Sequence, residues 1–133
     1  MATLLVKSIR DTARNIKTFE LVDPEGAELR AFAAGAHIEI KLPGGPERQY
    51  SLCNDPAETY RYVIAVLQEK ESRGGSKALH DQVREGDLLQ FSHPQNNFPL
   101  DQRGMHFTLI AGGIGVTPLL SMAHKLKALR KPF

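Results

Sequence analysis

Residues 37–53 read HIEIKLPGGPERQYSLC, and this stretch decides the fold. Two short runs rich in alternating apolar residues, 37–42 and 48–53, flank the sequence Pro43-Gly44-Gly45-Pro46. Proline presets one backbone angle and glycine tolerates positive φ, so the segment predicts a tight turn between two strands. Asp23-Pro24-Glu25-Gly26 predicts a second tight connection for the same reasons.

Similar runs occur on both sides of this hairpin. They are LLVKSIRD, IKTFELVD, RYVIAVL and DLLQFS, at residues 4–11, 16–23, 61–67 and 87–92. About six strands spaced so closely, with almost no helix between them, predict an antiparallel barrel or sandwich. A small barrel is favoured because it removes the exposed edges of an open sheet.

One short helix is predicted inside this mainly β region. Ser76 is expected to be its N-cap, and Ala78, Leu79 and Val83 form one buried face. The helix is expected to end before Gly86, because glycine commonly follows a helix C-terminus.

The pattern changes after Asp101, so residues 1–101 and 102–133 are predicted to belong to two domains, the second of them incomplete. FTLIA (107–111) predicts a buried strand, a glycine turn follows, and Thr117 is expected to be a helix N-cap. A strand, a glycine turn and a helix start present backbone N–H groups to a phosphate, which indicates a nucleotide site. The helix carries an apolar stripe expected to pack on a sheet, formed by Leu119, Met122, Ala123, Leu126 and Leu129.

The composition excludes several classes of function. A hydrophobic content of 41% and a net charge of +2 are ordinary for a soluble globular protein, and nucleic-acid binding is not indicated. A single cysteine, Cys53, excludes an internal disulfide, and the five histidines lack ligand spacing, so no metal site is expected. No apolar run approaches membrane-spanning length, so we expect a cytoplasmic protein without a membrane partner.

Two groups of residues could bind a ligand. Arg48 and Tyr50 lie on one face of a predicted strand and Ser51 on the other, and together they would suit a flat, phosphorylated, redox-active ring. The alternative is an ordinary barrel strand. Arg73-Gly74-Gly75-Ser76 could cradle a phosphate, or it could be a loop entering a helix through a serine cap.

The joint occurrence, in order, of RQYSLCNDP, RYVIAVLQE, RGGS, PQNNFPL and GGIGVTP resembles a known family. It is similar to the FMN-dependent phthalate dioxygenase reductase and vanillate demethylase reductase group of the ferredoxin reductase superfamily, as an N-terminal fragment. The resemblance implies a six-stranded Greek-key flavin-binding barrel, followed by the first β-α unit of a truncated NAD-binding domain.

The resemblance also implies an activity. Such reductases take a hydride from NADH onto FMN and pass electrons through a [2Fe–2S] centre, absent here, to a terminal oxygenase that acts on aromatic rings. Two alternatives stay open: an FAD-dependent ferredoxin-type reductase, and a non-catalytic flavin- or nucleotide-binding module. A homodimer through the exposed end of the truncated segment is a further expectation.

Site residues follow from the resemblance by matching position. Ser51 would be catalytic, by hydrogen bonding the reactive flavin edge near N5, and Tyr50 would flank the isoalloxazine. The full set implied for the flavin is Arg48, Gln49, Tyr50, Ser51, Ala65, Val66, Leu67, Gly74, Gly75, Ser76 and Thr117. Arg48, Ser76 and the amides of Gly74 and Gly75 would hold the phosphate. The set implied for NADH is Gly112, Gly113, Gly115 and Thr117.

Overall fold

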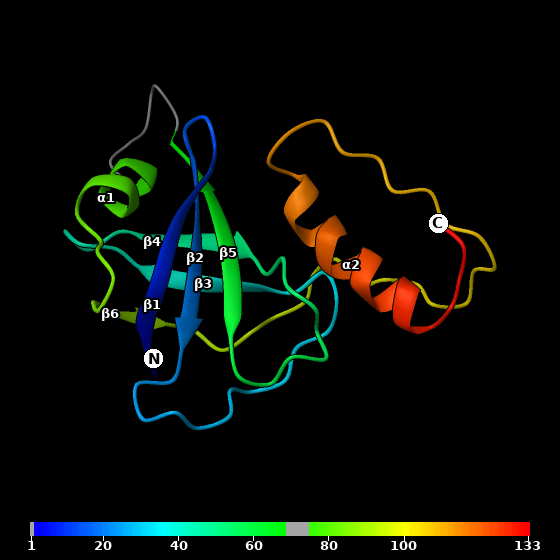
Figure 1. Cartoon of the computed structure of the whole chain (residues 1–133), viewed down its shortest axis with the longest axis horizontal. Helices are drawn as coiled ribbons and strands as arrows, with labels where there is room; N and C mark the ends of the chain where they lie inside the picture. The colour runs from blue at the N-terminus through cyan, green and yellow to red at the C-terminus, as the bar shows by residue number, and fades with distance from the viewer. Residues whose placement is uncertain (1, 69–74) are drawn as a thin grey trace.

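The computed structural model describes residues 2–68 and 75–133 (Figure 1). The six predicted strands are all present, with ends shifted by at most a few residues. They are β1 (Ala2–Ala13), β2 (Ile16–Val22), β3 (His37–Lys41), β4 (Glu47–Ser51), β5 (Tyr62–Leu67) and β6 (Leu88–Phe91). Two helices, α1 (Gly75–Asp81) and α2 (Val116–Ala128), complete the described structure.

The strands form one antiparallel sheet in the order β4-β3-β6-β1-β2-β5. The sheet curls, so that its two edge strands, β4 and β5, come close together (Figure 1). Just beyond β4, the N–H of Cys53 donates to the carbonyl of Val63 on β5 at 2.9 Å. The side chain of buried Asn54 continues this link, because its Oδ1 accepts the N–H of Val63 at 3.0 Å. The predicted barrel is therefore confirmed as a curled half-barrel whose open side lies between β4 and β5.

Local sequence explains the β3–β4 hairpin. Gly44 and Gly45 both have positive φ, 92° and 108°, and the N–H of Leu42 donates to the carbonyl of Pro46 at 2.8 Å. The turn at Asp23 also forms, because its carboxylate accepts the N–H of Glu25 at 2.8 Å. That turn is not a direct connection between strands, since residues 27–36 follow it before β3 begins.

Helix α1 closes one end of the half-barrel. Ala78, Leu79 and Val83 are buried as predicted, and Leu79 and Val83 join the main core, but the helix ends at Asp81, so Val83 lies beyond it and not on its face. His80 is also buried, and its Nε2 lies 2.7 Å from the carbonyl of Val66, which ties α1 to β5. The helix begins at Gly75, so Ser76 stands in its first turn and the prediction of an N-cap there is wrong.

Two predictions for the C-terminal part are corrected. Residues 107–111 form no strand and are mostly exposed, because a strand needs a neighbour to bond its backbone groups and none of the described strands lies beside them. Helix α2 begins at Val116 after Gly115, which makes no side-chain cap bond. Thr117 is therefore inside the helix, where its hydroxyl donates to the carbonyl of Ile114 at 3.1 Å.

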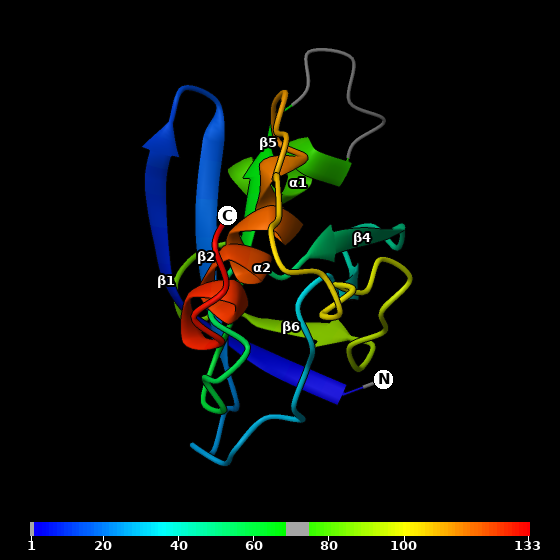
Figure 2. The same ribbon diagram turned by 90° about the vertical axis from the view of Figure 1, so that its right-hand side faces the viewer.

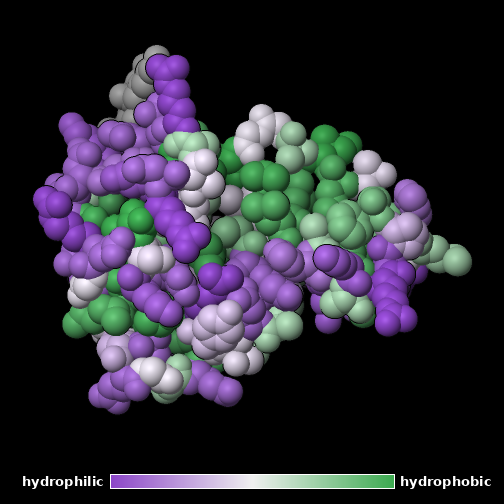
Figure 3. Space-filling view, in the orientation of Figure 1, coloured by the Kyte–Doolittle hydropathy of each residue, from purple (hydrophilic) through white to green (hydrophobic). Residues whose placement is uncertain are grey.

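The apolar stripe of α2 is only partly covered. Met122 and Leu126 are buried, whereas Leu129 is exposed, and Thr117 and Ser121 are buried instead. The helix faces loops of the half-barrel rather than a sheet, across a cleft of about 410 Å³. Figures 1 and 2 show α2 beside the half-barrel, and Figure 3 shows hydrophobic residues gathered over that part of the molecule. Neither described helix is long and apolar enough to span a bilayer.

Candidate functional site

Strand β4 presents its predicted site residues on two faces. Tyr50 is half-buried and packs against the hydrophobic core of the half-barrel. Gln49 and Ser51 point to the other face, where both line a hollow of about 250 Å³. The predicted separation of Tyr50 from Ser51 is therefore what the structure has.

The hollow beside Ser51 contains residues that the motifs did not single out as a group. Its walls are formed by Gly35, His37, Gln49, Ser51, Asn97 and Phe98. His37 and Ser51 are direct cross-strand partners on β3 and β4. The hydroxyl of Ser51 makes no hydrogen bond to any residue of the described ranges 2–68 and 75–133, so it remains able to bond a ligand.

The segment Pro94–Leu100 is fixed to the half-barrel by close contacts. Asn96 Nδ2 donates to the carbonyl of Ala34 at 3.0 Å, and Asn96 Oδ1 accepts the N–H of Phe98 at 3.0 Å. Gly35 has a φ of 99°, and a Cβ at this position would lie 1.9 Å from the carbonyl oxygen of Phe98. Only glycine fits there, and this contact places Asn97 and Phe98 in the hollow.

Strand β5 has one edge that does not pair with β2, and this edge lies at the open side of the half-barrel. Val63 uses that edge, since its carbonyl accepts the N–H of Cys53 and its N–H bonds Asn54. Because residues two apart turn their backbone groups to the same edge, Ala65 and Leu67 also face away from β2. Val66 differs, because its side chain is buried in the core and its carbonyl is bonded by His80.

The residues expected to hold a phosphate are only partly described. Arg48 is half-exposed on β4, and its guanidinium donates to the carbonyl of Glu47 at 2.9 Å. Ser76 lies in the first turn of α1, one residue after Gly75. Gly74, together with Arg73, lies outside the described residues.

The backbone of the glycine turn before α2 does not by itself require glycine. Gly112, Gly113 and Gly115 have no left-handed φ, and a Cβ added at any of them would meet nothing within 4 Å. Neither the backbone conformation nor packing within the described chain therefore requires glycine at these positions. Thr117 is the second residue of α2 and is buried.

Neither a reactive thiol nor a cluster of metal ligands is found among the described residues. Burial raises the pKa of the Cys53 thiol to about 11, and its sulfur donates to the carbonyl of Val63 at 3.3 Å. Such a thiol is a poor nucleophile. No group of three or more His, Cys, Asp or Glu side chains within residues 2–68 and 75–133 is placed to hold a metal ion.

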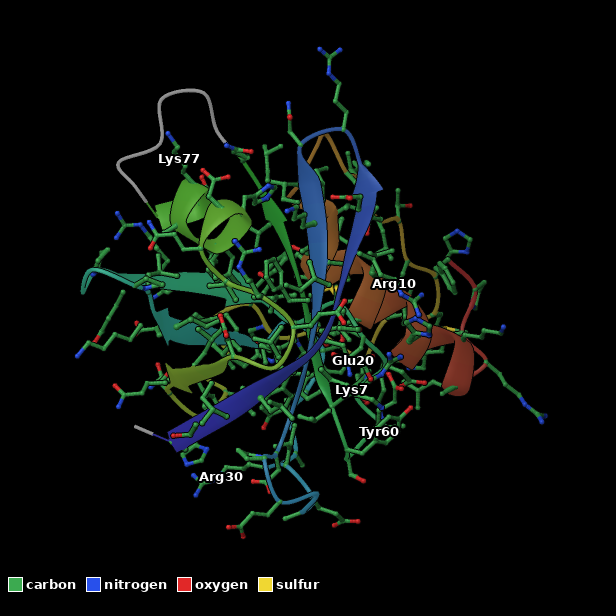
Figure 4. The ribbon with its side chains drawn as sticks, turned by 60° about the vertical axis from the view of Figure 1, so that its left-hand side comes forward. Lys7, Arg10, Glu20, Arg30, Tyr60 and Lys77 are labelled. Atoms are coloured by element: carbon green, nitrogen blue, oxygen red, sulfur yellow. The ribbon has the colours of Figure 1, made fainter. Side chains whose placement is uncertain are left out.

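A charged network covers the outer surface of β1, β2 and β5. Lys7 and Glu20, which Figure 4 labels side by side, are joined at 3.9 Å, and Arg61 lies 3.8 Å from the same carboxylate. Partial burial raises the pKa of Glu58, but hydrogen bonds from Arg61 at 2.8 Å and from Tyr60 outweigh it and lower the pKa overall. The network ties the connection between β4 and β5 to β2 through Arg61 and Glu20.

The arrangement defines a class of protein: a ferredoxin-reductase-like half-barrel that carries an RQYS strand at its open side and a glycine turn leading into a helix. Comparison with known proteins makes this more specific. The chain is 51% identical over 94% of its length to phthalate dioxygenase reductase of Burkholderia cepacia. It is also 51% identical over 96% of its length to vanillate O-demethylase oxidoreductase of Pseudomonas putida.

A solved structure of phthalate dioxygenase reductase agrees with this relationship. It matches 98% of this chain with a TM-score of 0.96 and 49% identity, and it is described as a modular structure for electron transfer from pyridine nucleotides to [2Fe–2S]. No protein-family model matches the chain. The chain is thus confirmed as a relative of the phthalate dioxygenase reductase and vanillate demethylase reductase group. It spans 39%, 40% and 41% of the lengths of these three relatives.

Proposed function

We propose that this chain is the flavin-binding part of an NAD(P)H-dependent oxidoreductase that supplies electrons to an oxygenase. The observation that carries the proposal is the open side of the half-barrel, where the RQYS motif of β4 faces the free backbone edge of β5. Relatives named as reductase components of oxygenases support it. FMN is the flavin we favour, a terminal aromatic-ring oxygenase is the partner, and the cytoplasm is the location.

Each residue of this open side has a use toward a flavin. Ser51 offers a hydroxyl that no described residue bonds, and it can donate one hydrogen bond and accept two, as a ring nitrogen that gains and loses a proton requires. Tyr50 offers a half-buried ring on the opposite face of β4, and Ala65 and Leu67 offer backbone N–H and carbonyl groups. When bound, a flavin takes up electrons in pairs and releases them singly, which suits a reductase between a pyridine nucleotide and a one-electron centre.

We assign phosphate binding to the start of β4, where Arg48 lies, and not to its end, where Ser51 lies. Arg48 can turn from its bond to the Glu47 carbonyl toward an anion, because a guanidinium binds a charged phosphate more strongly than a neutral carbonyl. Ser76 and the amides of Gly74 and Gly75 complete the proposed cradle, which the RGGS resemblance supports. Val66 contributes through the core that fixes β5, since its own carbonyl is bonded by His80.

The glycine turn is proposed to receive the pyridine nucleotide. Gly112, Gly113 and Gly115 are explained neither by φ nor by contacts within the described residues. Their lack of side chains fits the close approach of another molecule to the backbone, which glycine alone permits. Residues 102–133 are accordingly assigned to the start of a nucleotide-binding domain, with NADH as the substrate.

Mass spectrometry of the bound flavin tests the proposal. The purified chain is mixed with equal FMN and FAD, washed, and denatured to release what it holds; we expect FMN. Arg48→Ala should weaken FMN binding by roughly tenfold, since a hydrogen bond to a charged group contributes about 1.5–3 kcal/mol. Arg10→Ala, a matched change at an exposed position of β1, should leave binding unchanged. Recovery of no flavin would refute the proposal, and recovery of FAD would transfer the chain to the FAD-dependent reductases.

A further inference from the structure

His37 and Ser51 form the closest type of cross-strand pair. The backbone of His37 exchanges two hydrogen bonds with Gln95, at 2.9 and 3.0 Å, so its N–H and carbonyl point away from β4. His37 and Ser51 are therefore a non-hydrogen-bonded pair of the antiparallel ladder, in which Cα atoms are about 4.5 Å apart and side chains approach closely. Both side chains line the same hollow.

Neither side chain is occupied by another described residue. Within residues 2–68 and 75–133, the imidazole of His37 makes no hydrogen bond, and neither does the hydroxyl of Ser51. The neighbouring pair along the ladder is different, because Gln49 Nε2 donates to Glu39 Oε1 at 2.9 Å. The amide of Gln49 is thus committed, whereas His37 stands beside Ser51 with its ring nitrogens available.

We propose that His37 is a positioning residue that sets the direction of the Ser51 hydroxyl hydrogen. A neutral imidazole carries one N–H donor and one acceptor nitrogen, so it can either donate to Ser51 Oγ or accept from it. In the first case the Ser51 hydrogen is free to donate to a ligand; in the second the Ser51 oxygen accepts from one. The inference rests on the proposed function, in which the ligand atom beside Ser51 is a flavin nitrogen that differs in protonation between oxidised and reduced forms.

The test compares the affinities of the chain for oxidised and for dithionite-reduced FMN, measured anaerobically. The ratio of the two dissociation constants is the readout, because a role confined to folding would change both constants together. His37→Leu should change this ratio by roughly two- to tenfold, the range expected for one neutral hydrogen bond. His37→Asn, which keeps a donor and an acceptor, should restore most of the ratio. His124→Leu, at an exposed position of α2, is the matched control and should have no effect.

A double-mutant cycle separates action through Ser51 from direct contact. In a Ser51→Ala chain, His37→Leu should leave the ratio unchanged, since the group that His37 orients is already gone. An unchanged ratio for His37→Leu in the otherwise unaltered chain, with FMN still bound, would overturn this inference alone. An additive effect in the Ser51→Ala chain would also overturn it. Failure of the unaltered chain to bind FMN in either form would refute the proposed function, and this inference with it.

Discussion

Gly35→Ala is expected to be the most destabilising small substitution in the loops around the site. The glycine has a φ of 99°, and a Cβ there would lie 1.9 Å from the Phe98 carbonyl oxygen and 2.8 Å from its carbonyl carbon. Real Cβ atoms do not approach backbone this closely, so the segment around Phe98 must move. Because it is backbone that must shift, no change of rotamer relieves the contact.

The magnitude follows from two costs. A left-handed conformation costs a residue with a Cβ roughly 1–2 kcal/mol. Displacement of the segment also breaks the bond from Asn96 Nδ2 to the Ala34 carbonyl, which contributes about 0.5–1.5 kcal/mol. Strain in the displaced backbone adds to these, so we expect a loss of about 3 kcal/mol in the free energy of unfolding. Gly26→Ala is the matched control, because its φ is 78° and a Cβ there meets nothing within 4 Å.

Urea denaturation followed by far-ultraviolet circular dichroism measures the difference. Gly26→Ala should lose only the conformational cost, about 1–2 kcal/mol, and Gly35→Ala about twice as much. Gly35→Ala should also weaken FMN binding, because Asn97 and Phe98 leave the hollow beside Ser51. Equal losses for the two variants would refute the argument, because they would show that the contact with Phe98 costs nothing.

Three other predictions concern the Asn54 link between the ends of β4 and β5, the Cys53 thiol, and the mostly exposed residues 107–111. Asn54→Ala should destabilise the chain by about 2–4 kcal/mol in urea denaturation, because it leaves the buried N–H of Val63 unpaired; a loss below about 1 kcal/mol would contradict this. Cys53 should react slowly with iodoacetamide at pH 8, since a pKa of about 11 keeps it a thiol, and its rate should rise as the pH approaches 11. Fast labelling at pH 8 would show an accessible thiolate. Sedimentation velocity should reveal a concentration-dependent dimer that Ile110→Asp weakens, since Ile110 is 85% exposed; a strict monomer would exclude this contact.

The strands could be predicted because their information is local. Alternation of apolar and polar residues, with turn residues between the runs, is visible in 37–53 without any tertiary contact. FTLIA shows the limit of this reasoning. Its composition is that of a buried strand, but a strand is stable only beside a partner, and the chain offers none among the described residues. Helix caps failed for a related reason, because Thr117 bonds a carbonyl of its own turn instead of capping the helix.

Residues of the candidate site could be proposed where a sequence motif marks them. They could not be proposed where only the register of two strands brings them together. Ser51 was assigned from the RQYSL motif, and no described residue bonds its hydroxyl. His37 could not be assigned beside Ser51, because that placement depends on the register of two strands and on Gln95 taking the backbone bonds of His37. Asn54 was missed because no motif marks it, and its three bonds depend on how the connection from β4 to β5 folds back on itself.

Two groups of described glycines differ in backbone conformation and surroundings. Gly35, Gly44 and Gly45 have positive φ, and Gly35 also meets neighbouring backbone, so the fold of this chain accounts for them. The cluster Gly112, Gly113 and Gly115 has neither property. Replacing these three by alanine should therefore cost little stability, and the pyridine nucleotide that we propose for this turn would account for glycine by approaching its backbone. The fold thus accounts for Gly35, Gly44 and Gly45, whereas the glycines before α2 have the open surroundings that the proposed nucleotide site needs.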